Sequence, residues 1–521
     1  MKATIPSAGH PRVLIVTPEV TFVPHGMGPA SRSISARAGG LGDICAAQIH
    51  ALHEWGLDVH LAMPDYRNVF KINAHTMPGV DIHHRRQDLP ENRIHLAQDR
   101  AFYYHPKLFV TVDRENLRIA LAFQREVINR IIPEVQPDLV HCYDWMTGLI
   151  PAMARSIGMP CLFTFYRLDT PRLTLAAIEE QGIDAAAFWQ HCYYSRMPVD
   201  YAESRDGNPV DFLASAVFAA PIVSTLSQTF VNTLIHGADD PGTAAVSAQL
   251  RRKAAAGRLH AVAPAPDASF NPATDGALLR TYTPETQHAG KRFNKLQLQE
   301  LLGLEMDSAA PVCFWPTRLD GSRPGSHLMA DTLGTILERY RQQRLQVVFV
   351  ADGDFQAPMR RLIGQLNASD RVAVSDFDAR RCRLAYGSAD FVLMPLFLDP
   401  CALPCRIGQR YGALPIGYDG GAIHDCTEHL DPAANRGTGF LFKYFDADGL
   451  LWAIDQAMTF YSQPVHRRAP QIRRIMQESL IRFDPEATVR QTVALYARAL
   501  AGARPGAKAS GGVAAEDQAA A

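Results

Sequence analysis

The sequence contains no run of apolar residues long enough to cross a membrane, which takes about 18 or more. Residues 1–11 also lack the apolar core of a signal peptide. Neither sign of charge dominates, because 52 basic residues stand against 53 acidic ones, for a formal net charge of −1. Such a chain has no general attraction to nucleic acid or to an anionic membrane. We therefore expect a cytoplasmic protein that binds neither, with any phosphate ligand held by a local cluster.

Cysteine is sparse, and the nine cysteines are scattered and odd in number. This pattern favours a reducing compartment over a disulfide framework. The one close pair, Cys401 and Cys405, has neither C-x-x-C spacing nor a convincing second pair of ligands, so we predict no metal site. The signatures G-x-G-x-x-G after the first strand and G-x-x-x-x-G-K-[ST] are also absent. Their absence weakens an interpretation as a dehydrogenase or a P-loop protein.

The chain does contain two series of short apolar runs separated by helical segments. Runs in the first series lie at 12–19, 57–64, 137–142, 160–165 and 221–227, and those in the second at 312–316, 345–351, 371–374, 390–394 and 414–417. Helical spacing of apolar residues predicts a helix over 43–55, and residues 171–215 are expected to be a mostly helical insertion. Alternation of this kind is typical of an α/β fold with parallel sheets.

We predict two Rossmann-like, doubly wound domains that face a central cleft. The N-terminal domain is expected over 1–275 and the C-terminal domain over 290–480, followed by a helix over 481–502. The tail 503–521, rich in Ala, Gly and Ser, is expected to be disordered. In doubly wound folds, ligands bind at the carboxyl ends of the strands.

A glycine-rich turn at 38–43, of sequence AGGLGD, follows the first predicted strand. The adjacent Gly39 and Gly40 allow backbone N–H groups to approach a diphosphate closely. The N-terminus of the helix that follows favours negative charge. This sequence is equally compatible with an ordinary flexible turn between a strand and a helix. The segment alone therefore does not distinguish a diphosphate-binding turn from an ordinary one.

The same segment resembles the K-T-G-G-L-G-D loop of glycogen and starch synthases, and further matches follow in the order of that family. VHCYDWMTG at 140–148 is similar to V-H-A-H-D-W-H-T-G, and RYGALPI at 410–416 is similar to R-Y-G-T-L-P-I. Shorter resemblances lie at 270–275, 317–320, 386–395, 399–403, 420–421 and 438–442. Together the matches span roughly residues 12–460, and the chain is identified as a divergent member of this family.

The resemblance implies a fold and an activity. The family has the two-domain GT-B architecture and transfers glucose with retention of anomeric configuration. Its donor is a nucleotide sugar, usually ADP-glucose in bacteria, and its acceptor is the non-reducing end of an α-1,4-glucan. The reaction needs no metal and no cofactor beyond the nucleotide sugar. Nothing in the sequence indicates an oligomeric state.

The resemblance also assigns catalytic roles in the C-terminal domain. Arg318 and Arg323 match the Arg and Lys of the family's S-R-L-T-x-Q-K-G stretch, where they would stabilise the departing diphosphate. The change from Lys to Arg at 323 keeps the charge but alters its geometry. Asp399 stands in place of a glutamate that contacts the sugar hydroxyls, and it is one methylene shorter.

The remaining C-terminal positions are expected to bind the donor. Phe377 replaces a tyrosine near the base, so it can stack on adenine but cannot donate a hydrogen bond. A phenylalanine that packs in the domain core is an equally good interpretation. Leu403 begins a helix in the segment that replaces the family's G-L-T-Q, and Gly420 and Gly421 match a pair of glycines. Pro404 in the same segment has no backbone N–H to offer a phosphate, although proline is also common at helix starts.

In the N-terminal domain, Arg37 replaces the lysine of the glycine-rich loop and joins its glycines as a donor-binding residue. Asp144 matches the aspartate of H-D-W; it would orient a sugar hydroxyl or simply cap the following helix. Tyr166 stands where the family has a histidine close to the reacting sugar, and tyrosine is neutral at pH 7. Ala263 replaces an asparagine and cannot hydrogen-bond the donor.

These departures leave three functions open. The first is an active α-glucan synthase that uses ADP-glucose. The second is a GT-B glycosyltransferase with another donor or acceptor, which the changes at Tyr166, Ala263 and Pro404 favour. The third is a non-catalytic relative that binds a glucan or a synthase partner.

Overall fold

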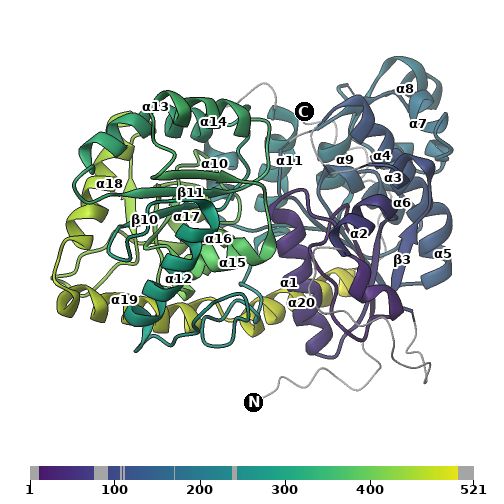
Figure 1. Cartoon of the computed structure of the whole chain (residues 1–521). Helices are drawn as coiled ribbons and strands as arrows, with labels where there is room; N and C mark the ends of the chain where they lie inside the picture. Colours follow the sequence, from purple (N-terminus) through teal and green to yellow (C-terminus); the bar gives the residue numbers. More distant parts are fainter. Residues whose placement is uncertain are drawn as a thin grey trace. The chain divides into compact units, whose positions relative to one another are not determined.

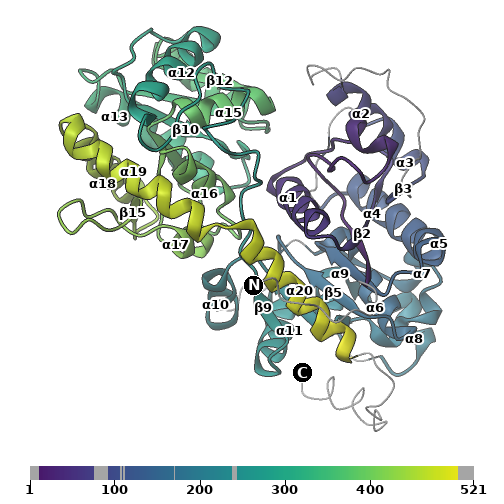
Figure 2. The ribbon, with the colours of Figure 1, turned by 90° about the horizontal axis from the view of Figure 1, so that it is seen from below.

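The computed structural model describes residues 11–74, 92–105, 108, 112–168, 170–196, 198–237 and 243–502. The chain divides into two compact units, shown in Figures 1 and 2. Unit 1 is formed by the described residues up to Leu226, by Val231–Ala263 and by those from Glu486 onward. Unit 2 is formed by Ser227–Phe230 and Pro264–Pro485.

Unit 1 is built on a seven-stranded sheet in the order β3-β2-β1-β4-β5-β8-β9, in which every neighbouring pair is parallel. Its strands are β1 (Arg12–Val16), β2 (Asp58–Pro64), β3 (Ile94–Ala97), β4 (Leu139–Tyr143), β5 (Cys161–Thr164), β8 (Ile222–Thr225) and β9 (Leu259–Ala261). All five residues of β4 are buried, as continuous apolar runs predict for a parallel sheet covered on both faces.

The helices of unit 1 cover this sheet. They are α1 (Gly40–Glu54), α2 (Arg67–Ala74), α3 (Arg100–Tyr103), α4 (Arg114–Glu126), α5 (Ile132–Val135), α6 (Ile150–Ser156), α7 (Leu175–Glu179), α8 (Tyr201–Gly207), α9 (Phe212–Ala219), α11 (Ala244–Ala255), α20 (Pro485–Gly502) and most of α10 (Gln228–His236). Short 3-10 turns lie at Pro29–Ser33, Trp145–Thr147, Ala185–Ala187 and Trp189–His191, and a π-helical turn at Val127–Ile131. The predicted insertion at 171–215 also holds an antiparallel pair, β6 (Arg172–Leu173) with β7 (Val210–Asp211).

Unit 2 contains a six-stranded, fully parallel sheet in the order β12-β11-β10-β13-β14-β15. Its strands are β10 (Val312–Trp315), β11 (Gln346–Val350), β12 (Val372–Ser375), β13 (Phe391–Met394), β14 (Leu414–Tyr418) and β15 (Phe440–Phe442). Its helices are α12 (Gln287–Leu302), α13 (Pro324–Arg339), α14 (Gln356–Gln365), α15 (Ala379–Ser388), α16 (Leu403–Arg410), α17 (Gly421–Cys426), α18 (Ala447–Tyr461) and α19 (Val465–Arg482). Both units therefore have the predicted doubly wound α/β fold.

The segment 270–275, which the sequence analysis assigns to the N-terminal domain, lies in unit 2. Its Asp275 accepts a hydrogen bond from the hydroxyl of Tyr411 and forms an ion pair with Arg383 at 3.3 Å. The guanidinium of Arg383 also lies 4.0 Å from the ring centroid of Phe270. Because Asp275 is buried, these contacts anchor the segment to the second core.

The predicted helix over 481–502 is divided between the two units. Its first residues end α19, which lies beside α16 in unit 2 (Figure 2), and α20 begins at Pro485, a favoured first helical residue. Helix α20 belongs to unit 1, where the hydroxyl of the buried Tyr496 lies 2.9 Å from Nδ1 of His141 on β4. The tail predicted over 503–521 lies outside the described residues.

Across the described ranges, no helix combines the length and the apolar character that a membrane span requires. No group of three or more His, Cys, Asp or Glu side chains in those ranges is arranged to hold a metal ion. All nine cysteines are buried, and none of them forms a disulfide.

Candidate active-site residues

In unit 1, the predicted site residues follow three neighbouring strands. Arg37 and the glycine turn follow β1, Asp144 follows β4, and Tyr166 follows β5. These strands are adjacent and parallel, so their carboxyl ends share one edge of the sheet. The structure therefore brings these predicted residues to one end of unit 1.

The backbone N–H groups of the glycine turn already bind a carboxylate of the protein itself. Oε2 of the buried Glu19 accepts hydrogen bonds from the backbone N–H groups of Ala38 at 2.6 Å and Gly39 at 2.8 Å. A carboxylate at a helix N-terminus is favoured by the backbone N–H groups and by the helix dipole. Glu19 thus occupies the donors at Ala38 and Gly39 that a diphosphate would use in this turn.

Close packing explains why glycine is needed here. A Cβ atom on Gly40 would lie 2.7 Å from the hydroxyl oxygen of Tyr166, and one on Gly42 would lie 3.1 Å from Oε2 of Glu19. Both distances are shorter than ordinary contacts, so a larger residue would displace Tyr166 or Glu19. The predicted residues Gly40 and Tyr166 are therefore direct neighbours.

Asp144 is buried and has a left-handed backbone conformation, with φ of 64°. Its side chain makes no capping hydrogen bond to the following helical turn. Instead, Oδ1 accepts a hydrogen bond from the backbone N–H of Arg167 at 3.1 Å. The guanidinium of Arg167 lies 3.9 Å from Oδ2 of Asp144 and 3.8 Å from Oε1 of Glu19, which links two carboxylates through one cation.

Sequence reasoning missed both Glu19 and Arg167. Glu19 follows a buried strand just before the glycine-rich loop. An acidic residue at this position was the one feature of the sequence that could have indicated its role. Arg167 follows Tyr166 directly, and its guanidinium lies 5.9 Å from the centroid of that ring. Only the fold shows that the two residues meet.

Arg37 is held by the first turn of α1. Its guanidinium donates to both oxygens of Asp43 at 3.0–3.1 Å, and Thr21 donates to the same carboxylate at 2.6 Å. The side chain of Arg37 is 20% exposed, so the ion pair fixes its position while leaving part of it accessible. Its positive charge is partly neutralised by the carboxylate of Asp43.

In unit 2, the predicted donor-binding residues also gather at the carboxyl ends of the strands. Arg318 follows β10, Phe377 follows β12, Asp399 follows β13, and Gly420 and Gly421 follow β14. Strands β10, β13 and β14 are adjacent in the sheet. The backbone N–H of Phe377 donates to Asp352, which follows β11, at 3.2 Å, and this contact ties two of the loops together.

Asp320 forms an ion pair with Arg323 and is also influenced by the charge of Arg318. Nε of Arg323 lies 3.7 Å from Oδ2 of Asp320. Burial alone would raise the pKa of Asp320, but hydrogen bonds from Ser322 and the charges of Arg323 and Arg318 outweigh burial and lower that pKa. Both positive charges therefore act on the carboxylate of Asp320.

Helix α13 begins at Pro324, directly after Arg323. Proline is favoured at a first helical position, so its presence is compatible with this loop. A Cβ atom on the next residue, Gly325, would lie 2.2 Å from the carbonyl oxygen of Pro395, so this turn packs closely on the loop after β13. That packing brings Arg323 toward Asp399.

Asp399 is buried, and burial raises its pKa despite the opposing hydrogen bond from Ala402 and the charge of Arg323. Oδ2 accepts the backbone N–H of Ala402 at 2.6 Å, and the backbone carbonyl accepts that of Ala422 at 2.8 Å. Gly421 has φ of 52°, and a Cβ atom there would lie 2.5 Å from the carbonyl oxygen of Asp399. Gly421 is thus needed to hold Asp399 in place.

Leu403 is the first residue of α16, and its side chain is buried in unit 2. Pro404 lies in the first turn of the same helix, a common position for proline. Ala402, the residue before the helix, has left-handed backbone geometry with φ of 47°. This geometry directs the N–H of Ala402 to Asp399. The buried side chain of Leu403 packs in the interior of unit 2.

Comparisons with known proteins agree on one family. The sequence model of the starch synthase catalytic domain matches residues 12–246. The glycogen synthase of Geobacillus thermodenitrificans is 28% identical over 82% of this chain and 89% of its own length. The glycogen synthase of Thermotoga petrophila is 27% identical over 89% of this chain and 96% of its own length.

Solved structures show the same fold. The catalytic domain of starch synthase IV from Arabidopsis thaliana, bound to ADP and acarbose, covers 95% of this chain and all of its own, with a TM-score of 0.75 and 20% identity. The trehalose-6-phosphate synthase OtsA matches with a TM-score of 0.53 and 13% identity, over 94% of this chain and 99% of its own. With its two parallel-sheet α/β units and these relatives, the chain has the GT-B architecture and is a divergent relative of the glycogen and starch synthases.

Proposed function

We propose that the protein transfers glucose from ADP-glucose to the non-reducing end of an α-1,4-glucan, with retention of anomeric configuration. Relationship to a family of hexosyltransferases supports the reaction class. The observation that supports the site is the placement of Arg318 and Arg323 around Asp320, close to the buried Asp399 in unit 2.

The chemistry requires charge stabilisation at the leaving group. As the bond between glucose and diphosphate breaks, negative charge grows on the diphosphate and positive character grows on the sugar. Fixed guanidinium groups stabilise that negative charge without having to reorganise, and they can donate two parallel hydrogen bonds to a phosphate. We assign this task to Arg318 and Arg323, and the proposal includes no metal or additional cofactor.

Asp399 is assigned to the sugar. Its Oδ2 is engaged by the N–H of Ala402, so Oδ1 is the oxygen that would accept a hydrogen bond from a glucose hydroxyl. An ionised Asp399 would also oppose the positive charge that develops on the sugar. Because burial raises its pKa, the charge of Arg323 is needed to favour the ionised form.

In unit 1 we assign contacts with the sugar but no contact with the diphosphate. Glu19 fills the N–H groups of Ala38 and Gly39, so we assign diphosphate binding to the arginines of unit 2 rather than to the glycine turn. Tyr166 would donate a hydrogen bond from its hydroxyl group to a sugar oxygen. Asp144, held by the N–H of Arg167, would accept from a sugar hydroxyl.

The test is to incubate the purified protein with glycogen and radiolabelled ADP-glucose, and in parallel with UDP-glucose. Label is expected to enter glycogen from ADP-glucose and to be released by β-amylase, an enzyme that cleaves α-1,4 linkages from non-reducing ends. Release by β-amylase would show both the linkage and the retained α-configuration. Label that enters from UDP-glucose alone would reject the donor, and label that resists β-amylase would reject the linkage.

A second candidate, a glucan-binding protein without transferase activity, is favoured by one observation. Tyr166, which is neutral, occupies the position where the sequence analysis expects the family's histidine, and its hydroxyl lies directly against the Gly40 turn. This candidate predicts binding of glycogen with no turnover of either nucleotide sugar, so the same experiment separates the two functions.

A further inference from the structure

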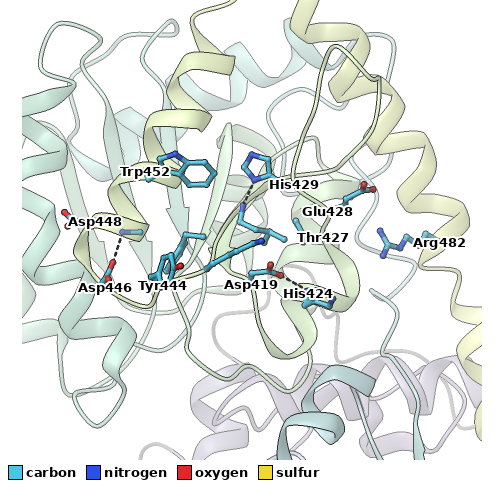
Figure 3. A pocket seen from close by; sticks show the side chains of 14 residues that line it. Asp419, His424, Thr427, Glu428, His429, Tyr444, Asp446, Asp448, Trp452 and Arg482 are labelled. Atoms are coloured by element: carbon cyan, nitrogen blue, oxygen red, sulfur yellow. Dashed lines mark hydrogen bonds and ion pairs between the residues drawn. The ribbon is translucent and has the colours of Figure 1, made fainter. Parts of the chain in front are cut away.

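Unit 2 contains a pocket of about 1220 Å³. Figure 3 shows it among α17, the end of β15 and the first turns of α18. None of the predicted donor-binding residues is among the residues that line it, although Asp419, next to Gly420, is. The pocket is therefore distinct from the predicted donor site.

Two exposed aromatic side chains line this pocket. Trp452 on α18 is 48% exposed and Tyr444 is 76% exposed. The ring of Trp452 stacks on His429 with centroids 5.3 Å apart and planes 24° apart (Figure 3). His429 in turn accepts a hydrogen bond from the backbone N–H of Leu441 at 3.2 Å. Trp452 thus lies on a support that is fixed to β15 and offers a rigid apolar face.

Hydrogen-bonding groups surround these rings. Asp446 and Asp448 lie at the start of α18 beside Tyr444, and Glu428 lies on the other side of the pocket (Figure 3). Oδ1 of Asp446 accepts the backbone N–H of Gly449 at 2.8 Å, which fixes this carboxylate as a helix cap. Carboxylate oxygens are acceptors only, so they suit a ligand that carries many hydroxyl groups.

The charge of the lining argues against a phosphate ligand. Its carboxylates belong to Asp419, Glu428, Asp446 and Asp448, while its permanent cations are only Lys443 and Arg482. Asp419 is also paired with His424 at 2.6 Å. A nucleotide diphosphate would meet net repulsion here, whereas a neutral polyhydroxylated molecule would not.

We propose that this pocket binds a chain of the α-glucan, with sugar rings stacked on Trp452 and Tyr444 and hydroxyl groups donated to the surrounding carboxylates. Stacking on a face and hydrogen bonding at the edges match the two chemical surfaces of a glucose ring. The choice of α-glucan among neutral carbohydrates rests on the proposed function. The pocket would hold the polymer to the protein independently of the transfer step.

The experiment measures migration of the full-length protein in native gels that contain increasing glycogen. Trp452→Ala is expected to raise the dissociation constant for glycogen about tenfold, or ~1.4 kcal/mol, since an aromatic anchor contributes on this scale. Trp452→Phe should retain most of the affinity, and Tyr444→Ala should weaken it. The matched control is Phe293→Ala, because Phe293 on α12 is 46% exposed and lies outside the pocket.

Wild-type affinity in Trp452→Ala would overturn the inference, as would equal weakening by Phe293→Ala. A loss of ADP binding without a loss of glycogen binding in Trp452→Ala would also overturn it. Transfer from ADP-glucose is assayed on the same samples. Glycogen binding that depends on Trp452 without any transfer would support the pocket while rejecting the proposed transferase. Thermal midpoints of all variants show that the losses do not come from unfolding.

Discussion

The carboxylate of Glu19 accepts the backbone N–H of Gly39 at 2.8 Å, so the glycine turn of unit 1 is closed by an internal anion. The same oxygen accepts the N–H of Ala38 at 2.6 Å. A turn that resembles a phosphate-binding loop is in this way used to fix the start of α1. This relationship changes which residues are expected to bind the donor.

Removing Glu19 should open this turn to an external anion. Glu19→Ala leaves the buried N–H of Ala38 and the partly buried N–H of Gly39 without this acceptor, which is expected to lower the free energy of unfolding by about 2–4 kcal/mol. Sulfate or phosphate should then raise the thermal midpoint of the variant more than that of the wild type. Scanning fluorimetry across a series of sulfate concentrations tests both effects.

The control for Glu19 is Glu54→Ala, because Glu54 is exposed at the end of the same helix. It should change neither the stability nor the response to sulfate. Equal responses of Glu19→Ala and wild type to sulfate would show that Glu19 is not a substitute for a bound anion.

Arg318→Ala should abolish most of the transfer while leaving glycogen binding intact. Loss of one fixed group that stabilises charge in the transition state typically lowers kcat by about 10²–10³-fold. Arg341→Ala serves as the matched control, because Arg341 is 75% exposed and pairs only loosely with Glu338 at 3.5 Å. Initial rates with radiolabelled ADP-glucose give the comparison. Full activity in Arg318→Ala would remove Arg318 from the proposed mechanism.

The raised pKa of Asp399 predicts a pH dependence of the reaction. Activity that needs the ionised carboxylate should fall as the pH drops through a pKa above the ordinary value for aspartate. Asp399→Asn should lower kcat/KM strongly and remove this acidic limb. The measurement is a profile of kcat/KM against pH for both proteins.

The same shift has a consequence for stability. A raised pKa in the folded state means that Asp399 contributes most favourably at low pH, when protonated, and that this contribution is lost as the pH rises through the folded pKa. Asp399→Asn removes this loss and keeps an acceptor for the N–H of Ala402. Its urea midpoint at pH 8 should therefore equal or exceed that of the wild type. A lower urea midpoint for Asp399→Asn at pH 8 would contradict the conclusion that burial of Asp399 raises its pKa.

His141 should make unit 1 sensitive to acid. Burial lowers the pKa of His141 to about 3, so the folded protein holds it neutral between Tyr496 at 2.9 Å and Thr164 at 2.8 Å. A lowered pKa contributes stability that is complete above about pH 6.5, the ordinary value for histidine, and is lost as the pH falls toward 3. The expected slope is up to about 1.4 kcal/mol per pH unit.

Urea unfolding at pH 7, 5 and 4 measures this slope. His141→Gln should flatten it, because glutamine does not titrate. Tyr496→Phe should lower the free energy of unfolding by about 1 kcal/mol without changing the slope. A slope unchanged in His141→Gln would show that other groups cause the acid sensitivity.

The sequence predicted the interior of both sheets well and their edges less well. Strands β10 and β13 are continuous apolar runs, and β1 and β4 are apolar apart from Arg12 and His141, because parallel strands are covered on both faces. Strands β3, β9 and β15 were not predicted. They are edge strands: β3 and β9 are interrupted by a histidine, and β15 has only three residues, so none of them shows a clear apolar run.

The candidate site was predictable where motifs follow strands, since parallel topology brings the loops after adjacent strands together. The motifs thus placed Asp144 and Tyr166 after adjacent strands of unit 1, and Arg318 and Asp399 after adjacent strands of unit 2. The partners of these residues were not predictable. Glu19 and Ala38 are 19 residues apart, and His141 and Tyr496 are 355 apart, and no local pattern encodes such pairs.

Unit 1 is assembled from both ends of the chain, because α20 follows the whole of unit 2 in sequence. A fragment that stops at Pro485 would contain all of unit 2 but would leave His141 without Tyr496. The packing of unit 1 is therefore complete only once α20, which follows unit 2 in sequence, has been made. The hydrogen bond between His141 and Tyr496 joins the interior of the first sheet to this late segment.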